Sequence, residues 1–133
     1  MVKESHFDIL QMLTAIPVPA FVFDLETRYF LAANPGFERL LGYSSEELRT
    51  KKVSEIRPAE DVALLERALK EEPPEGAVEW RYIHKNGELI HVQLKYRNSE
   101  FLIGRRLHHT RLVVVTSWDT EAVKKARDVF DGE

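Results

Sequence analysis

The sequence predicts a single α+β domain in which short helices interrupt an antiparallel sheet. Its 133 residues are 44% apolar, which suits one globular domain. Residues 34–48 contain the start and stop signals of two very short helices. From Ala77 onward, apolar and polar residues alternate as they do in half-buried β-strands.

The chain begins with a predicted amphipathic helix over residues 5–16. Ser5 and Asp8 have the spacing of a helix cap, and Pro17 and Pro19 end the pattern. Two strands follow, over residues 20–23 and 29–33, and a polar turn joins them.

The two short helices that come next each carry a complete set of end signals. Asn34 is a favourable N-cap, and Pro35 suits the first helical position, where no N–H is needed. Gly42 can adopt the left-handed conformation that ends the first helix. Ser44 and Glu47 have capping-box spacing and begin the second.

A longer helix is predicted from Pro58 to Glu72. Acidic residues in its first turn suit the helix dipole, and its apolar face is formed by Val62, Leu65 and Leu69. Two prolines in residues 71–76 then prevent any helix from continuing.

The hairpin around Asn86-Gly87 can be assigned a register. A two-residue turn would place Glu79 and Arg81 on the buried face, whereas a three-residue loop opposes His84 to Glu88. We predict the three-residue loop, because it gives one apolar face made of Val78, Trp80, Tyr82, Ile90, Val92 and Leu94. We also predict Glu79 and Arg81 to form a surface pair.

The same reasoning applies to a turn at Gly104-Arg105. It pairs Leu94 with Val115 and Tyr96 with Val113, so both valines join the inner face. The opposite face then carries an apolar row made of Leu112, Val114 and Trp118. An apolar row on the outer face of a sheet indicates that another segment packs against it. We expect this segment to be the N-terminal helix of this chain or of a second copy.

Several short motifs in this order resemble the PAS sensor domain. They are residues 33–37, 41–43, 46–48, 58–61, 84–88 and 118–121, and the resemblance runs from Phe7 to Ala126. The sequence departs from the family pattern at Thr27, Asn86 and Trp118, where glycine, aspartate and a smaller residue are usual.

The resemblance implies a five-stranded antiparallel sheet with short helices over one face and any ligand between them. It implies an N-terminal helical cap (1–19), a PAS core (20–118) and a C-terminal helical connector (119–133). Residues expected to line the pocket are Phe23, Ile56, Val62, Leu65, Leu69, Trp80, Tyr82, Val92, Leu94 and Val115. The alternative is that these residues simply fill a core without a cavity.

The resemblance also implies that a signal leaves through the end of the last strand. Here the exit is Trp118, Asp119, Thr120 and Glu121, followed by helical spacing over residues 122–130. Asp119 could instead act only as the cap of that helix. The expected dimer face is Phe7, Leu10, Leu13, Leu112 and Val114.

Cofactor classes can be compared with the residues present. The chain has no cysteine, which excludes the covalent flavin adduct of LOV-type members. Haem is not expected, because residues 58–72 lack the histidine that haem-binding members use. Non-covalent flavin or a small organic acid remains open, so the cofactor is unknown.

The remaining basic residues form a cluster by the second hairpin: Arg105, Arg106, His108, His109 and Arg111. This cluster is either an anion or partner site or a solvated hairpin end. Adjacent histidines on a strand point to opposite faces, so we expect no metal site here.

No catalytic motif is present, and we expect a sensory domain rather than an enzyme. We expect a cytoplasmic homodimer that relays its signal to an output domain, such as a histidine kinase of a two-component system. The alternative is a ligand-free module for dimerisation or protein interaction. A net charge of −3 argues against nucleic acid, and no apolar run is long enough to cross a membrane.

Overall fold

The computed structural model describes residues 2–3 and 6–131 and confirms the α+β class. Its strands are β1 (Val2–Lys3), β2 (Ala20–Asp24), β3 (Phe30–Ala33), β4 (Glu75–Ile83), β5 (Leu89–Ile103) and β6 (Arg106–Thr120). Its helices are α1 (His6–Thr14), α2 (Pro35–Leu41), α3 (Ser45–Leu48), α4 (Val62–Glu71) and α5 (Glu121–Asp131). Two 3₁₀ turns, at Val53–Ile56 and Ala59–Asp61, precede α4.

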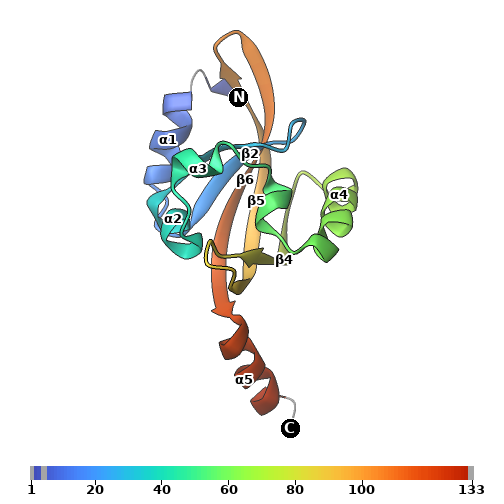
Figure 1. Cartoon of the computed structure of the whole chain (residues 1–133). Coiled ribbons are helices and arrows are strands. Elements are labelled where there is room, and N and C mark those ends of the chain that lie inside the picture. The colour runs from blue at the N-terminus through green and yellow to red at the C-terminus, as the bar shows by residue number, and fades with distance from the viewer. Residues whose placement is uncertain (1, 4–5, 132–133) are drawn as a thin grey trace.

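The five expected strands form one antiparallel sheet in the order β3-β2-β6-β5-β4 (Figure 1). The two-residue β1, which the sequence did not predict, adds a parallel pairing at Glu100 and Phe101 of β5. The central strand of the sheet is β6, and it leads directly into α5. The C-terminal helix is therefore attached to the middle of the sheet.

Both predicted hairpin registers are confirmed. The N–H of His84 donates to the carbonyl oxygen of Glu88 at 2.8 Å, and Gly87 has a φ of +93°. Trp80 therefore pairs with Val92, on one face of the sheet. In the second hairpin, the pairs Leu94–Val115 and Tyr96–Val113 both form.

A bulge in β6 changes the orientation of Trp118. Leu94 pairs with Val115 but Gln93 pairs with Ser117, so the residue between them has no opposite partner. Trp118 is consequently opposite Val92 and lies on the same face as that core residue. The predicted outer row is wrong for Trp118, because one extra residue reverses the alternation beyond it.

Asn34 connects three segments of the chain. Its side-chain oxygen accepts hydrogen bonds from the N–H of Phe37, as the predicted N-cap, and from the N–H of Ala20, at 3.0 and 2.9 Å. Its amide nitrogen donates to the carbonyl oxygens of Leu13, Ile16 and Val18. One buried side chain thus fixes the end of α1, the start of β2 and the start of α2 together.

The other predicted caps are confirmed, and they connect the helices to the first hairpin. Gly42 has a φ of +82°, and Ser44 and Glu47 form the reciprocal capping box. The ammonium of Lys85, in the hairpin loop, bonds to Glu47 at 2.8 Å, and this bond together with the capping bond from the Ser44 N–H lowers the pKa of the Glu47 carboxyl to about 2. The N–H of Lys85 also donates to the carbonyl oxygen of Leu41 at 2.8 Å.

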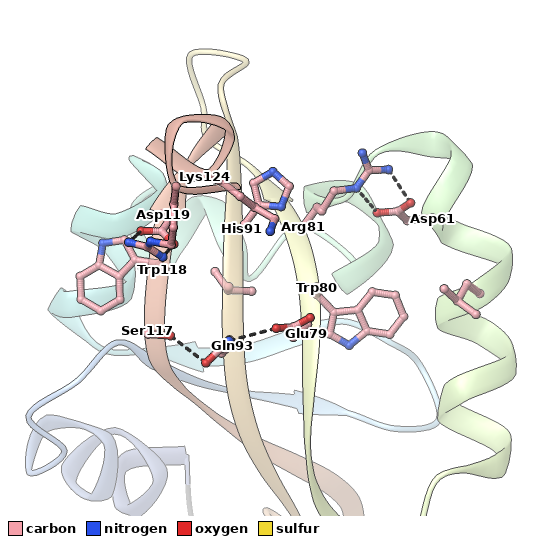
Figure 2. A pocket seen from close by; sticks show the side chains of 13 residues that line it. Asp61, Glu79, Trp80, Arg81, His91, Gln93, Ser117, Trp118, Asp119 and Lys124 are labelled. Carbon is pink, nitrogen blue, oxygen red and sulfur yellow. Dashed lines mark hydrogen bonds and ion pairs between the residues drawn. The ribbon is translucent and has the colours of Figure 1, made fainter. Parts of the chain in front are cut away.

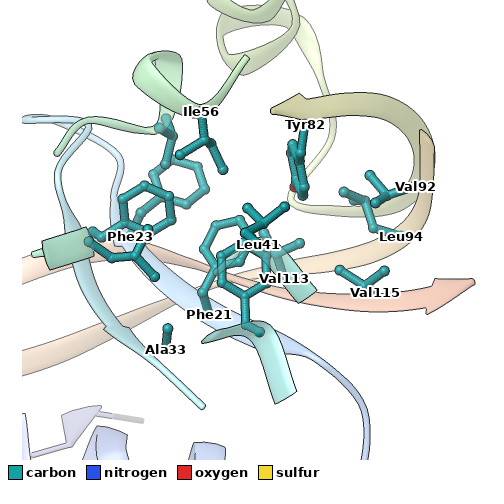
Figure 3. Packing of buried hydrophobic residues seen from close by; sticks show 14 of the residues in the cluster. Phe21, Phe23, Ala33, Leu41, Ile56, Tyr82, Val92, Leu94, Val113 and Val115 are labelled. Carbon is teal, nitrogen blue, oxygen red and sulfur yellow. The ribbon is translucent and has the colours of Figure 1, made fainter. Parts of the chain in front are cut away.

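Each face of the sheet has its own apolar cluster. The larger cluster joins the sheet to α2, α3 and α4, and Figure 3 shows Phe21 and Tyr82 within it. The rings of Phe30 and Phe37 pack against Phe21, and Phe37 also packs against Tyr82. On the other face, Ile9 of α1 packs with Ala20 and Val22, and Leu112 and Val114 lie at the margin.

The helix α1 of the same chain therefore covers the part of the outer face formed by β2 and β3. Leu13 of α1 has no exposed surface, so it cannot make the predicted contact with a second copy while α1 is in place. The side chain of Phe7 lies outside the described residues. Within the described ranges, no helix combines the length and apolar character needed to cross a membrane.

Candidate functional site

A small cavity lies where the larger cluster meets α4. Its volume is about 20 Å³, enough for one water molecule. Six residues of the predicted pocket line it: Phe23, Leu65, Leu69, Trp80, Tyr82 and Leu94. The cavity is thus at the expected place, but most of the space between sheet and helices is filled by side chains.

The other predicted pocket residues do not reach this cavity. Ile56, Val92 and Val115 are buried in the surrounding cluster (Figure 3). Val62 is only half-buried and lies outside that cluster. Because α4 begins at Val62, its inward face starts one turn later, at Leu65.

Arg57 is the most unusual group at the cavity. It follows a 3₁₀ turn, and only 7% of its surface is exposed. One guanidinium nitrogen donates to the carbonyl oxygen of Val53 at 2.5 Å. The guanidinium carbon lies 5.2 and 4.9 Å from the ring centres of Trp80 and Tyr82. Its Nε has no hydrogen-bond partner among the described residues.

Within the described part of the chain, no carboxylate forms an ion pair with Arg57. The charges of Asp61 and Glu72 do reach it, but each of these carboxylates bonds to a different arginine. Asp61 accepts from Arg81 at 2.9 and 2.7 Å, and Glu72 accepts from Arg111 at 2.7 Å. Burial lowers the pKa of Arg57, yet arginine stays charged in proteins, so a positive charge is buried without its own counter-ion.

Arg111 lines the same cavity, and its partners are complete. It is 4% exposed, and besides Glu72 it donates from Nε to the Asn98 side-chain oxygen at 2.8 Å. Its guanidinium carbon lies 3.9 Å from the ring centre of Tyr96. With two arginines and Glu72 as the charged lining groups, the lining has a net charge of +1.

Tyr82 lies beside Arg57 at the cavity. The residue has no exposed surface, and the guanidinium of Arg57 is the hydrogen-bonding group next to its hydroxyl. Burial raises the pKa of Tyr82, so the phenol is neutral at physiological pH and cannot balance the charge of Arg57.

This polar group could not be predicted from the sequence. Arg57 stands in no recognisable motif, and Arg111 was expected in the basic cluster by the second hairpin. That placement is wrong, because Arg111 is buried. The alternation of the strand could have indicated this, since Arg111 lies on the same face of β6 as the inward-facing Val113 and Val115. His108 pairs instead with Asp24 at 2.6 Å.

Trp118 and Asp119 of the predicted signal exit line a surface pocket of about 700 Å³, whereas Thr120 and Glu121 do not (Figure 2). Across the sheet beside it, Ser117 donates to Gln93 at 3.1 Å, and Gln93 donates to Glu79 at 3.0 Å. The predicted surface pair of Glu79 with Arg81 is wrong, because Arg81 reaches past the sheet edge to Asp61.

Two side-chain pairs connect α5 to the sheet. Asp119 bonds to Arg127, and Glu121 bonds to His91 of β5. The hydroxyl of Thr120 accepts from the N–H of Val123 at 3.3 Å and caps the helix. The alternative in which Asp119 is the cap is therefore wrong, because its carboxylate is held by Arg127.

Three large apolar side chains of α5 are exposed among its charged residues. The helix extends away from the sheet (Figure 1), and Val123, Val129 and Phe130 are 49%, 68% and 79% exposed. A helix with this surface has apolar residues available for a further contact.

Comparisons with known proteins agree with this architecture. A family model described as the PAS fold matches residues 30–101. A PAS domain from a two-component sensor histidine kinase is 18% identical, with a TM-score of 0.65 over 85% of this chain and 94% of its own. The PAS domain of an HTR-like protein from Haloarcula marismortui is 16% identical, with a TM-score of 0.64 over 86% and 89%.

A LOV protein from Rhodobacter sphaeroides has a similar fold as well. It is 20% identical, with a TM-score of 0.65 over 83% of this chain and 66% of its own. No curated protein sequence matches this chain.

Proposed function

This chain belongs to the PAS fold family, and on that premise we propose that it binds a small ligand in the cavity beside Arg57 and relays this event to an output domain. The observation that carries the proposal is the buried guanidinium of Arg57 at this cavity, which forms no ion pair with a carboxylate of the described residues and whose Nε has no hydrogen bond of standard geometry there. Buried polar groups in a folded domain are normally satisfied, so unsatisfied ones favour a missing partner.

The route of the signal is β6. This strand carries Arg111 and Val113 at the cavity and ends at Thr120, where α5 begins. A ligand that shifts the packing of α4 on the sheet would move the end of β6 and, through His91 and Glu121, the start of α5. The exposed apolar side chains of α5 would then contact a second copy or an output domain such as a histidine kinase.

The family membership also supports a non-catalytic role in a cytoplasmic regulator. Among the described residues, no group of three or more acidic or histidine side chains could hold a metal ion. On the family membership we assign no reaction to the domain and regard a change of conformation as its output.

A second candidate function is a ligand-free module for dimerisation. The cavity volume of about 20 Å³ favours it, because a cavity of this size holds no flavin or haem in the observed packing.

Native mass spectrometry of gently purified protein separates the two candidates. We expect one small molecule per chain that is lost when the protein is denatured. The bare chain mass alone would contradict ligand binding and favour the ligand-free module. Flavin or haem would be identified directly by mass.

We expect the protein to be a dimer through its outer face. A groove of about 460 Å³ runs over β4, β5 and β6 there, and it is lined by the apolar Leu112 and Val114 next to the charged Glu75, Lys95 and Arg97. Val114→Glu should shift the mass measured by light scattering from dimer to monomer, because a carboxylate in a buried apolar contact is costly. Thr116→Glu adds the same charge at the exposed bulge and should leave the dimer intact. An unchanged mass for Val114→Glu would contradict this interface.

A further inference from the structure

We infer that α4 is a lid closed by three ion pairs, and that the ionic strength of the solution sets how often it opens. The helix lies at one side of the sheet, apart from α2 and α3 (Figure 1). Its Leu65 and Leu69 line the small cavity, so an outward movement of α4 uncovers that cavity. The inference goes beyond the proposed function, because it requires no bound ligand.

Apolar packing holds α4 only weakly to the sheet. Of its described residues, Leu65 alone is buried. Leu69 is half-buried, and Leu64 is 55% exposed. By contrast, Ile9 and Leu13 of α1 have no exposed surface and pack against the other face of the sheet. Because helices in proteins are stabilised mainly by burial of an apolar face, α4 depends on other contacts.

Ion pairs attach both ends of α4 to the sheet. At its start, the Asp61 carboxylate accepts hydrogen bonds of 2.9 and 2.7 Å from Arg81 of β4 and makes no helix-capping bond. At its end, Glu72 accepts from Arg111 of β6 at 2.7 Å. The Arg81 side chain is 34% exposed and that of Arg111 only 5%, so the solvent reaches the first pair more easily.

A third ion pair holds the middle of α4, and its arginine has a strained backbone. Arg28, in the turn between β2 and β3, pairs with Glu66 at 3.2 Å. Its φ is +72°, in the left-handed region that residues other than glycine rarely adopt. Such a residue persists where its contacts compensate, and the Arg28 guanidinium bonds to Glu66 and to the carbonyl oxygen of Leu25.

Salt weakens the three pairs unequally. The Debye length falls from roughly 20 Å at about 20 mM salt to roughly 4 Å at about 500 mM, and exposed pairs are screened more than buried ones. The Glu66 side chain is 42% exposed, whereas Glu72 and Arg111 are 17% and 5% exposed. The start and the middle of α4 should therefore loosen first, while the end at Glu72 acts as the hinge.

Hydrogen exchange of the α4 amides measures the opening. Between about 20 mM and about 500 mM NaCl, we expect exchange at residues 65–67 to rise about fivefold, and less at residues 70–71. Sodium sulfate at the same ionic strength should act alike, and sucrose at the same osmolality should have no such effect. Exchange in α1, which apolar contacts hold, should not rise.

Matched variants identify the ion pairs as the cause. Glu66→Gln should raise α4 exchange at low salt about threefold and reduce the response to salt. Glu71→Gln changes an exposed carboxylate of the same helix outside the three pairs and should alter neither quantity. Arg28→Gly removes the middle pair where φ suits glycine, so α4 should loosen without a fall in the stability of the whole domain.

Four results would each overturn the inference. They are unchanged or slower α4 exchange at high salt, an equal rise in α1, a response to sucrose as large as that to NaCl, and equal effects of Glu66→Gln and Glu71→Gln. Failure of the ligand proposal is distinguishable from these. Salt-dependent opening of α4 without a retained small molecule would support the lid and contradict ligand binding.

Discussion

Replacement of Asn34 by alanine is expected to destabilise the fold by about 4 kcal/mol. The side chain is 3% exposed and makes five hydrogen bonds, to the N–H groups of Ala20 and Phe37 and to three carbonyl oxygens at the end of α1. Alanine loses the helix cap and also leaves the Ala20 N–H and the Val18 carbonyl oxygen without these bonds in a buried place.

Urea unfolding followed by circular dichroism measures this loss, and Ser44→Ala is the matched control. Ser44 caps α3 in the same way, but it is exposed, so water replaces its hydroxyl and the loss should be about 1 kcal/mol. Equal losses for the two variants would contradict the role of Asn34 as the connection between α1, β2 and α2.

Local rules account for what could be predicted from the sequence. The caps at Asn34, Gly42 and Ser44 depend on residues within one turn of the chain. The hairpin registers follow from the two-residue period of a strand, combined with the cost of burying Glu79 and Arg81. Both kinds of evidence are local, and the structure confirms both.

The features that could not be predicted depend on distant segments. The bulge before Ser117 has no marker in its own neighbourhood, and it reversed the expected orientation of Trp118. Arg57 and Arg111 were missed because charged residues are usually exposed. Here Trp80, Tyr82 and Glu72 are brought to them by β4 and by the end of α4, and no periodicity within one element contains that information.

The two buried arginines are expected to respond to substitution in opposite ways. Arg111→Met should cost about 3 kcal/mol, because it leaves the half-buried Glu72 carboxylate and the Asn98 amide without their partner and removes the contact of Arg111 with the Tyr96 ring. Arg57→Met should be within about 1 kcal/mol of the wild type or more stable. Methionine keeps the contact with Trp80 and Tyr82, and it removes a buried charge that has no ion pair in the described part of the chain.

The difference in unfolding free energy between Arg111→Met and Arg57→Met is the most direct test of an uncompensated charge in the sheet–helix cavity. It should be measured in urea, in a zwitterionic buffer without small anions, so that no ligand stabilises Arg57. We expect Arg111→Met to be the less stable variant by at least about 2 kcal/mol. Equal losses in the two variants would mean that the fold already balances the charge of Arg57, and they would contradict the assignment of this cavity as the sensory site.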